Sequence, residues 1–143
     1  MQVKDIMKKN VRSIPPGSSV QKAAKKMDKY GIGSLIITDG NKMKGIVTGR
    51  DILIKVVARG CDPSKTTVNE IMTREVVMID PSKTITDASE IMTSKKIKKL
   101  PVIEEDNLVG IVTASDIITT EPKMLEALGS LFLMSDKKKN IAG

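Results

Sequence analysis

At 143 residues, 40% of them hydrophobic, the chain is long enough for one compact domain or for two small domains that share a core. It has no histidine and one cysteine, Cys61, which excludes histidine-based triads, histidine–zinc sites and disulfide frameworks, so we expect no enzyme, metal or catalytic cofactor. No apolar run approaches the roughly 18 residues that span a bilayer, and no apolar segment marks the N-terminus for secretion. We therefore expect a cytoplasmic protein with no membrane contact.

The net charge of +7 raises the alternative of a regulatory protein that associates with nucleic acid through its basic surface. Part of this charge lies in Lys22, Lys25, Lys26 and Lys29, which alternate with apolar residues at helical spacing, as on the solvated face of an amphipathic helix. Aromatic residues for base stacking are nearly missing. A nucleic-acid complex would lose affinity on the order of 10³-fold from roughly 50 to 200 mM salt.

The sequence repeats itself at a fixed offset of 65 residues. When residues 3–54 are aligned without a gap to residues 68–119, 16 of 52 positions are identical. The strongest match is Gly45-Ile-Val-Thr-x-x-Asp51 with Gly110-Ile-Val-Thr-x-x-Asp116. We predict a first repeat at residues 1–62, a second at 63–120, and a C-terminal helix with a basic tail at 121–143, with a hinge at 59–64.

In repeat one, a helical turn at 3–7 leads into an extended segment that ends at Pro16. Ser18 is expected to open an amphipathic helix that Gly31 closes. Two β-branched runs, 34–38 and 44–48, flank the turn residues Asp39-Gly40-Asn41 and predict a hairpin, and a second helix is expected from Gly49. Repeat two follows the same order, with a turn at 68–72, Pro81, a helix from Ser82, strands at 100–103 and 108–112, and a helix from Ala114.

This order predicts an α/β fold of two pseudo-symmetric β-α-β-β-α repeats, packed through their sheets because neither half buries enough surface alone. After repeat two, Pro122 is placed to start a further helix. An apolar stripe follows, made of Met124, Leu125, Leu128, Leu131 and Phe132. The stripe either closes the module or forms a contact between two copies of the chain. We expect the chain to form a homodimer.

The duplicated motifs resemble the CBS (cystathionine-β-synthase-type) domain family over residues 3–119. The resemblance implies a tandem pair, or Bateman module, with two clefts that bind AMP, ADP, ATP or S-adenosylmethionine and regulate a partner protein. It also implies that the adenine pocket of repeat one is lined by Ser13, Ile14, Pro16, Ile32, Gly33, Ser34 and Leu35. The matching residues in repeat two are Met78, Ile79, Pro81, Lys99, Leu100 and Pro101.

The Thr-x-x-Asp pairs, Thr48 with Asp51 and Thr113 with Asp116, stand where a strand passes into a helix. A carboxylate there can accept hydrogen bonds from both hydroxyls of a ribose, and Arg50 supplies a guanidinium for phosphate. The same spacing is also that of a helix capping box, and the two roles can coexist.

The two repeats differ at the candidate site. Repeat two has Met78 in place of Ser13 and Ser115 in place of Arg50, and Lys98 or Lys99 can either replace the lost charge or be solvated. We therefore expect repeat one to bind ligand more tightly.

Overall fold

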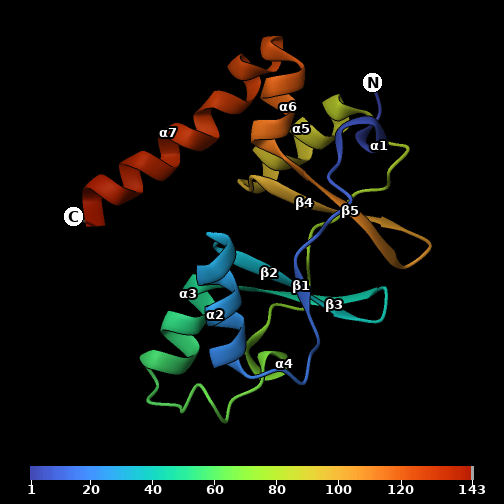
Figure 1. Cartoon of the computed structure of the whole chain (residues 1–143). Helices are drawn as coiled ribbons and strands as arrows, with labels where there is room; N and C mark the ends of the chain where they lie inside the picture. Colours follow the sequence, from blue (N-terminus) through green and yellow to red (C-terminus); the bar gives the residue numbers. More distant parts are fainter. Residues whose placement is uncertain (143) are drawn as a thin grey trace. The chain divides into compact units, whose positions relative to one another are not determined.

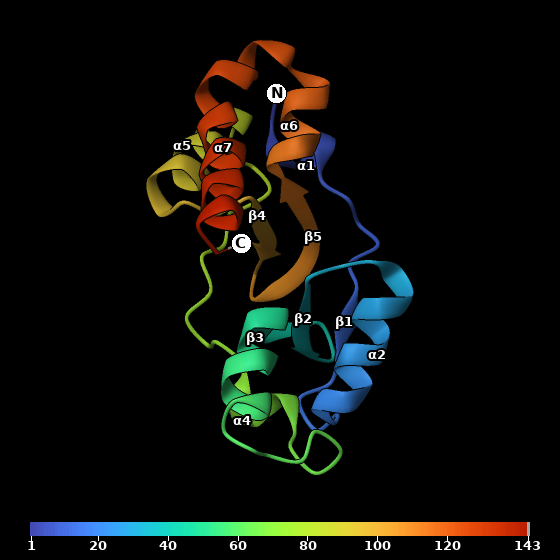
Figure 2. The ribbon, with the colours of Figure 1, turned by 90° about the vertical axis from the view of Figure 1, so that its left-hand side faces the viewer.

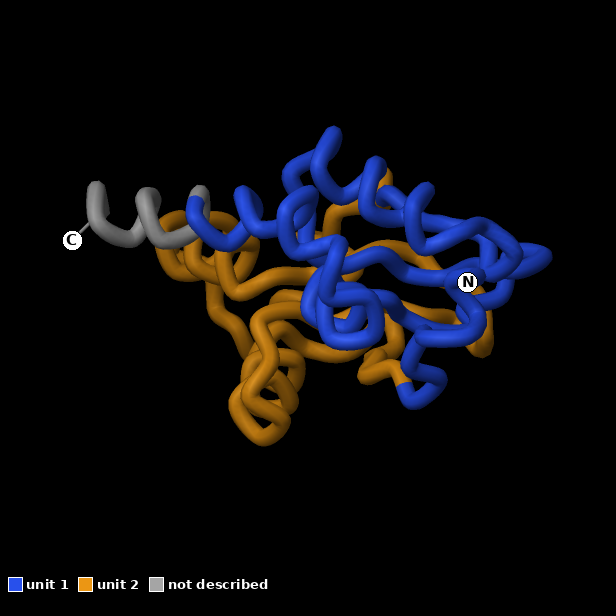
Figure 3. Tube along the Cα trace, turned by 90° about the horizontal axis from the view of Figure 1, so that it is seen from above, with its two compact units in different colours: residues 1–10, 77–143 blue, residues 11–76 orange. Residues whose placement is uncertain are grey.

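The structure, a computed structural model, describes residues 1–142, with side chains as far as Leu133. It divides into two compact units, which Figure 3 shows in different colours. Unit 1 contains Met1–Asn10 and the chain from Val77 onward, and unit 2 contains Val11–Val76. The expected α/β class is confirmed, but the compact units are not the sequence repeats. Residues 59–64, the expected hinge, lie inside unit 2.

Unit 2 holds a small sheet with helices (Figure 1). Its elements are β1 (Ser13–Ile14), α2 (Val20–Tyr30), β2 (Ser34–Asp39), β3 (Lys42–Thr48), α3 (Gly49–Ile52), the π-helical turn η1 (Leu53–Val57) and α4 (Val68–Ile71). β1 pairs with β2 in parallel, and β2 pairs with β3 as the expected hairpin. Gly40 has φ 63° in the hairpin turn, a conformation that favours glycine.

Helix α2 begins one residue later than expected. Its N-cap is Ser19, whose side chain accepts a hydrogen bond from Lys22 N, whereas Ser18 N donates to Pro15 O in the preceding turn. Val20, Ala23 and Met27 form the buried face, and Gly31 ends the helix in the left-handed conformation, as predicted.

Unit 1 contains strands β4 and β5 and most of the helices (Figure 2). Its elements are α1 (Val3–Ile6), α5 (Ile85–Lys95), β4 (Lys99–Glu104), β5 (Asn107–Thr113), α6 (Ala114–Thr120), the 3₁₀ turn η2 (Pro122–Met124) and α7 (Leu125–Ala142). Strands β4 and β5 form the second expected hairpin. Thr84, not Ser82, caps α5, because Ser82 instead bonds to Asp80 within the preceding turn.

The apolar stripe after Pro122 closes the core of unit 1. Leu128 and Leu131 are buried in that core, and Met124 and Phe132 pack against it. Leu125 and Leu133 remain exposed. The stripe is therefore not a free surface, which removes the argument for a dimer that rested on it. The side chains of residues 134–143, including the basic tail, lie outside the described residues.

The N-terminal ends of the two repeats are exchanged between the units. Residues 1–10 belong to unit 1, where Val3 N donates to Lys83 O at 2.8 Å and Lys8 exchanges backbone hydrogen bonds with Ile111. Their counterparts, residues 66–75, belong to unit 2, where Thr73 makes the same exchange with Ile46. Val3 and Val68 are fully buried, so each exchanged segment contributes apolar area to the repeat that receives it. Within residues 1–142, no helix is both long and apolar enough to cross a membrane.

Candidate functional site

In unit 2 the hairpin brings one group of predicted site residues together. Ser34, the first residue of β2, lies opposite Thr48, the last residue of β3. Gly49 N donates to Gly33 O at 3.0 Å, which holds the start of α3 against the residue before β2. Gly33, Ser34, Thr48 and the first turn of α3 therefore meet at one end of this sheet, and Arg50 is exposed there.

Thr48 and Asp51 form a complete capping box. Thr48 N and Thr48 Oγ1 each donate to Asp51 Oδ2 at 3.0 Å, and Asp51 N donates back to Thr48 Oγ1 at 3.1 Å. The other carboxylate oxygen, Oδ1, lies 3.4 Å from Lys55 Nζ, which also donates to Ile71 O at 2.8 Å. Both oxygens of Asp51 are thus engaged inside the unit.

The remaining predicted site residues of repeat one make contacts that hold unit 2 together. Ser13 O accepts a 2.6 Å hydrogen bond from Lys26 Nζ of α2. Ile14 and Leu35 are buried in the core of unit 2, and Ile32 packs against it. Pro16 follows β1, and its carbonyl accepts from Asn69 N at 3.1 Å.

Unit 1 repeats this arrangement with a different balance of hydrogen bonds. Lys99 lies opposite Thr113, and Ala114 N donates to Lys98 O at 2.8 Å. Asp116 N donates to Thr113 Oγ1 at 3.1 Å. Within the described residues, however, neither Thr113 N nor Thr113 Oγ1 donates to the Asp116 carboxylate, so the capping box is only half formed.

The Asp116 carboxylate is therefore poorly satisfied. Its Oδ1 lies 3.5 Å from Lys8 Nζ, and its Oδ2 is buried without a hydrogen-bond partner among the described residues. A buried oxygen of this kind destabilises the protein by about 1–3 kcal/mol, and by more when it carries charge. Sequence reasoning missed Lys8 because this lysine precedes Asp116 by more than a hundred residues and carries no motif.

The other repeat-two candidates divide into buried and exposed residues. Ile79 and Leu100 belong to the core of unit 1, and Pro81 and Pro101 are buried as well. Met78, Lys99 and Ser115 are exposed. Lys98 Nζ lies 5.2 Å from the centroid of the Phe132 ring, a cation–π contact that neither of the roles considered for Lys98 included.

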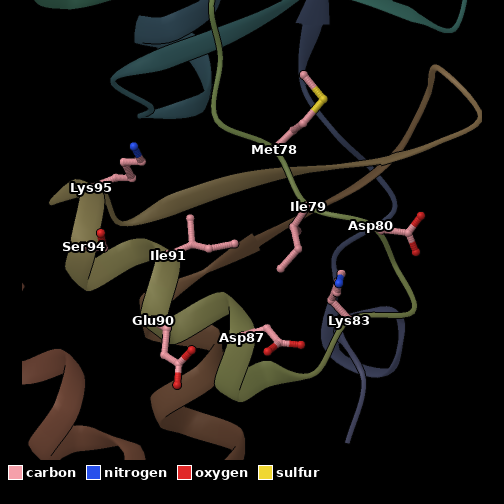
Figure 4. Close-up of a pocket in the computed structure, with 9 residues that line it drawn as sticks. All are labelled: Met78, Ile79, Asp80, Lys83, Asp87, Glu90, Ile91, Ser94 and Lys95. Carbon is pink, nitrogen blue, oxygen red and sulfur yellow. The ribbon is translucent and has the colours of Figure 1, made fainter.

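A pocket of about 480 Å³ lies in unit 1 between α5 and residues 78–83 (Figure 4). Of the predicted site residues it includes Met78 and Ile79, and it does not include Thr113 or Asp116. Ile79 and Ile91 point toward each other across it. Ile91 corresponds in the repeat to Lys26, whose side chain crosses from α2 to Ser13 in unit 2. An isoleucine side chain has no donor for such a hydrogen bond.

Two acidic residues of this pocket have lowered pKa values. The side-chain and backbone hydrogen bonds from Ser82 lower the pKa of Asp80, and those from Thr84 lower the pKa of Asp87. Their carboxylates are thus already hydrogen-bonded in turns and caps. Among the described residues, no group of three histidine, cysteine or acidic side chains is placed to hold a metal ion.

Comparison with known proteins gives the family. The sequence profile of the CBS domain matches residues 3–58 and 68–122. A CBS domain-containing protein of Bacillus subtilis, YhcV, is 34% identical over 119 residues, which is 83% of this chain and 84% of that protein. Hypoxic response protein 1 of Mycobacterium tuberculosis is 34% identical over 121 residues, or 84% and 85% of the two chains.

Solved structures agree. The crystal structure of Hypoxic Response Protein I with two coordinated zinc ions matches with a TM-score of 0.76 and 33% identity over 83% of this chain and 98% of that one. The two profile matches coincide with the two sequence repeats, and the fold agrees with that of a solved family member. The chain therefore belongs to the CBS domain family, as a tandem pair of CBS domains.

Proposed function

We propose that the chain is a regulatory module that binds an adenosine-containing nucleotide at its Thr-x-x-Asp sites. The observation that carries the proposal is the Asp116 carboxylate, whose Oδ1 has only a 3.5 Å contact from the exposed Lys8. A ribose presents two neighbouring hydroxyl donors, which suit an acceptor-only carboxylate. Hydrogen bonds from the ribose would take the place of that single contact at Oδ1, and a hydrogen bond to a charged group contributes roughly 1.5–3 kcal/mol.

The family supports the regulatory part of the proposal. Inosine-5'-monophosphate dehydrogenase of Korarchaeum cryptofilum is 35% identical over 114 residues, and the matched segment is 23% of that enzyme. A CBS pair thus accompanies an enzyme of nucleotide metabolism in that protein. In this chain, ligand would act by favouring one conformation of the module, which a partner protein would then recognise.

The contacts lead us to reverse the expected ranking of the two sites. The residue types in the sequence predict tighter ligand binding by repeat one, which has Ser13 and Arg50. In unit 2, however, a ribose must compete with Thr48 and Lys55 for Asp51, whereas in unit 1 it competes only with a 3.5 Å contact from Lys8. We infer that Asp116 binds the ribose of the more tightly held ligand.

We also propose that the chain forms a homodimer. On η1, the side chains of Leu53, Ile54 and Val57 are 60%, 40% and 64% exposed. Three neighbouring exposed apolar side chains on one turn mark a contact surface. The hexameric CBS-CP12 protein from cyanobacteria, with a TM-score of 0.68 and 33% identity, is a CBS protein that assembles from several copies.

A melting-temperature screen tests the ligand. The chain is heated with AMP, ADP, ATP, S-adenosylmethionine, NAD and GTP, each at several concentrations. A ligand at ~100 times its dissociation constant adds about 2.7 kcal/mol to the free energy of unfolding. We expect stabilisation by at least one adenosine compound and none by GTP. Stabilisation by no adenosine compound up to millimolar concentration would refute the proposed ligand class.

A further inference from the structure

We propose that Lys8 is the phosphate-binding residue of the Asp116 site, and that this site therefore takes a phosphorylated nucleoside rather than an uncharged one. The proposal rests on the proposed function and assigns its ligand more narrowly. In repeat one, Arg50 is the residue that offers a positive charge to a phosphate. The equivalent position in repeat two is Ser115, so the motif itself carries no cation there.

The exchanged N-terminal segment supplies a cation at this place. Lys8 N donates to Ile111 O, and Ile111 N donates to Lys8 O, both at 2.9 Å, which fixes the Lys8 backbone beside β5. From there its ammonium reaches to within 3.5 Å of Asp116 Oδ1. The side chain is 68% exposed, so it is held by its backbone and by this one contact.

Lys55 is the matched case in unit 2 and behaves differently. Its ammonium also lies beside an aspartate, but it donates at 2.8 Å to Ile71 O as well, and its side chain is 33% exposed. Lys55 is thus tied to α4 and serves the structure of its unit. Lys8 Nζ makes no hydrogen bond to a described residue, and an exposed lysine can turn from Asp116 to an arriving anion without losing one.

The two groups match the two ends of a nucleoside phosphate. The ribose hydroxyls are donors and suit the Asp116 carboxylate, whose Oδ1 has only the 3.5 Å contact from Lys8. The phosphate is an acceptor and an anion, and it suits the ammonium that the ribose displaces from Oδ1. The ammonium then keeps an anionic partner, and the carboxylate exchanges its ion pair for hydrogen bonds from the ribose. Adenosine satisfies the aspartate alone and leaves the ammonium without its former partner.

The test compares AMP with adenosine by calorimetry on the full chain. The variants are Lys8→Met, which keeps the length of the side chain and removes its charge, and Lys55→Met as the matched control. We expect Lys8→Met to weaken AMP binding by about tenfold or more and to leave adenosine affinity unchanged or higher, because a charge-assisted contact to phosphate is lost. Lys55→Met should leave the preference for AMP over adenosine as it is.

Lys99 is a second lysine near this site, because it lies opposite Thr113 and is exposed. The variant Lys99→Met therefore tests whether Lys99, rather than Lys8, binds the phosphate. If Lys99→Met removes the preference for AMP and Lys8→Met does not, the assignment of Lys8 is wrong. Equal weakening of AMP and adenosine by Lys8→Met would overturn it as well. If the wild-type chain binds neither AMP nor adenosine nor any other adenosine compound of the melting-temperature screen, the proposed function itself fails, so the two failures are distinguishable.

Discussion

Gly110 lies so close to Met7 that a Cβ atom on the glycine would stand 2.7 Å from Met7 Sδ and 3.0 Å from Lys8 O. At the matched position, a Cβ atom on Gly45 would stand 2.6 Å from Thr73 O and 2.9 Å from Met72 Sδ. Each glycine of the two Gly-Ile-Val-Thr strands thus makes room for an exchanged segment. This is the close backbone approach that glycine inside a strand indicates.

Gly45→Ala should destabilise the protein by about 1–3 kcal/mol, because the added methyl must push a backbone carbonyl away from Ile46. Gly110→Ala should cost less, since its nearest neighbour is a flexible methionine sulfur. Gly17→Ala is the control, because nothing lies within 4 Å of its Cβ position. Thermal unfolding followed by circular dichroism measures all three. Equal melting temperatures for Gly45→Ala and Gly17→Ala would show that the segment is not held as described.

Asp116→Asn and Asp51→Asn should separate ligand binding from stability. Asp116→Asn should weaken binding of the adenosine ligand by about 10- to 150-fold, since a hydrogen bond to a charged group contributes roughly 1.5–3 kcal/mol. Asp51→Asn should instead lower the free energy of unfolding by about 1 kcal/mol through the loss of its cap, and should change the affinity little. Calorimetry and thermal unfolding on both variants give the two quantities. Loss of binding in Asp51→Asn alone would restore repeat one as the tighter site.

Leu53→Asp should shift the chain from dimer to monomer, because a carboxylate cannot be buried in an apolar contact without a partner. Leu133→Asp is the control, since Leu133 is similarly exposed, at 65%, but lies on α7 of unit 1. Light scattering at tens of micromolar protein reports the mass. A wild-type mass of one chain, or a dimer that survives Leu53→Asp, would contradict the proposed surface.

Acid should lower the melting temperature between about pH 5 and pH 3. Hydrogen bonds from Ser64, Thr67, Ser82 and Thr84 hold the pKa values of Asp62, Glu70, Asp80 and Asp87, respectively, below their ordinary values. A group with a lowered pKa in the folded state contributes stability above its unfolded pKa, and this is lost as the pH falls through the folded pKa.

Glu70→Gln tests that mechanism, because the variant cannot titrate at this position. It should reduce the change in melting temperature across the pH range, as differential scanning calorimetry would show. A melting temperature that rises on acidification would contradict the sign of the effect.

The sequence by itself determined the repeat, the family and nearly every element. The 65-residue offset and the turn residues around Gly40 are local patterns, so the two hairpins and the helices that follow them were predicted within a few residues. The helix starts were predicted less well. Ser18 and Ser82 are good caps in isolation, but Ser19 and Thr84 are the residues whose side chains meet a free helical N–H.

The tertiary structure decided most of the features that distinguish the two sites. Thr48-x-x-Asp51 and Thr113-x-x-Asp116 are the same motif in sequence, yet both oxygens of Asp51 are engaged and one oxygen of Asp116 is not. Lys55 is an i,i+4 neighbour of Asp51 and has Thr120 as its counterpart, so that part of the difference is local, whereas Lys8 reaches Asp116 from a distant element. A hydrogen bond depends on the final position of both partners to within a few tenths of an ångström. Local sequence preferences do not determine positions that accurately for residues that lie a hundred residues apart.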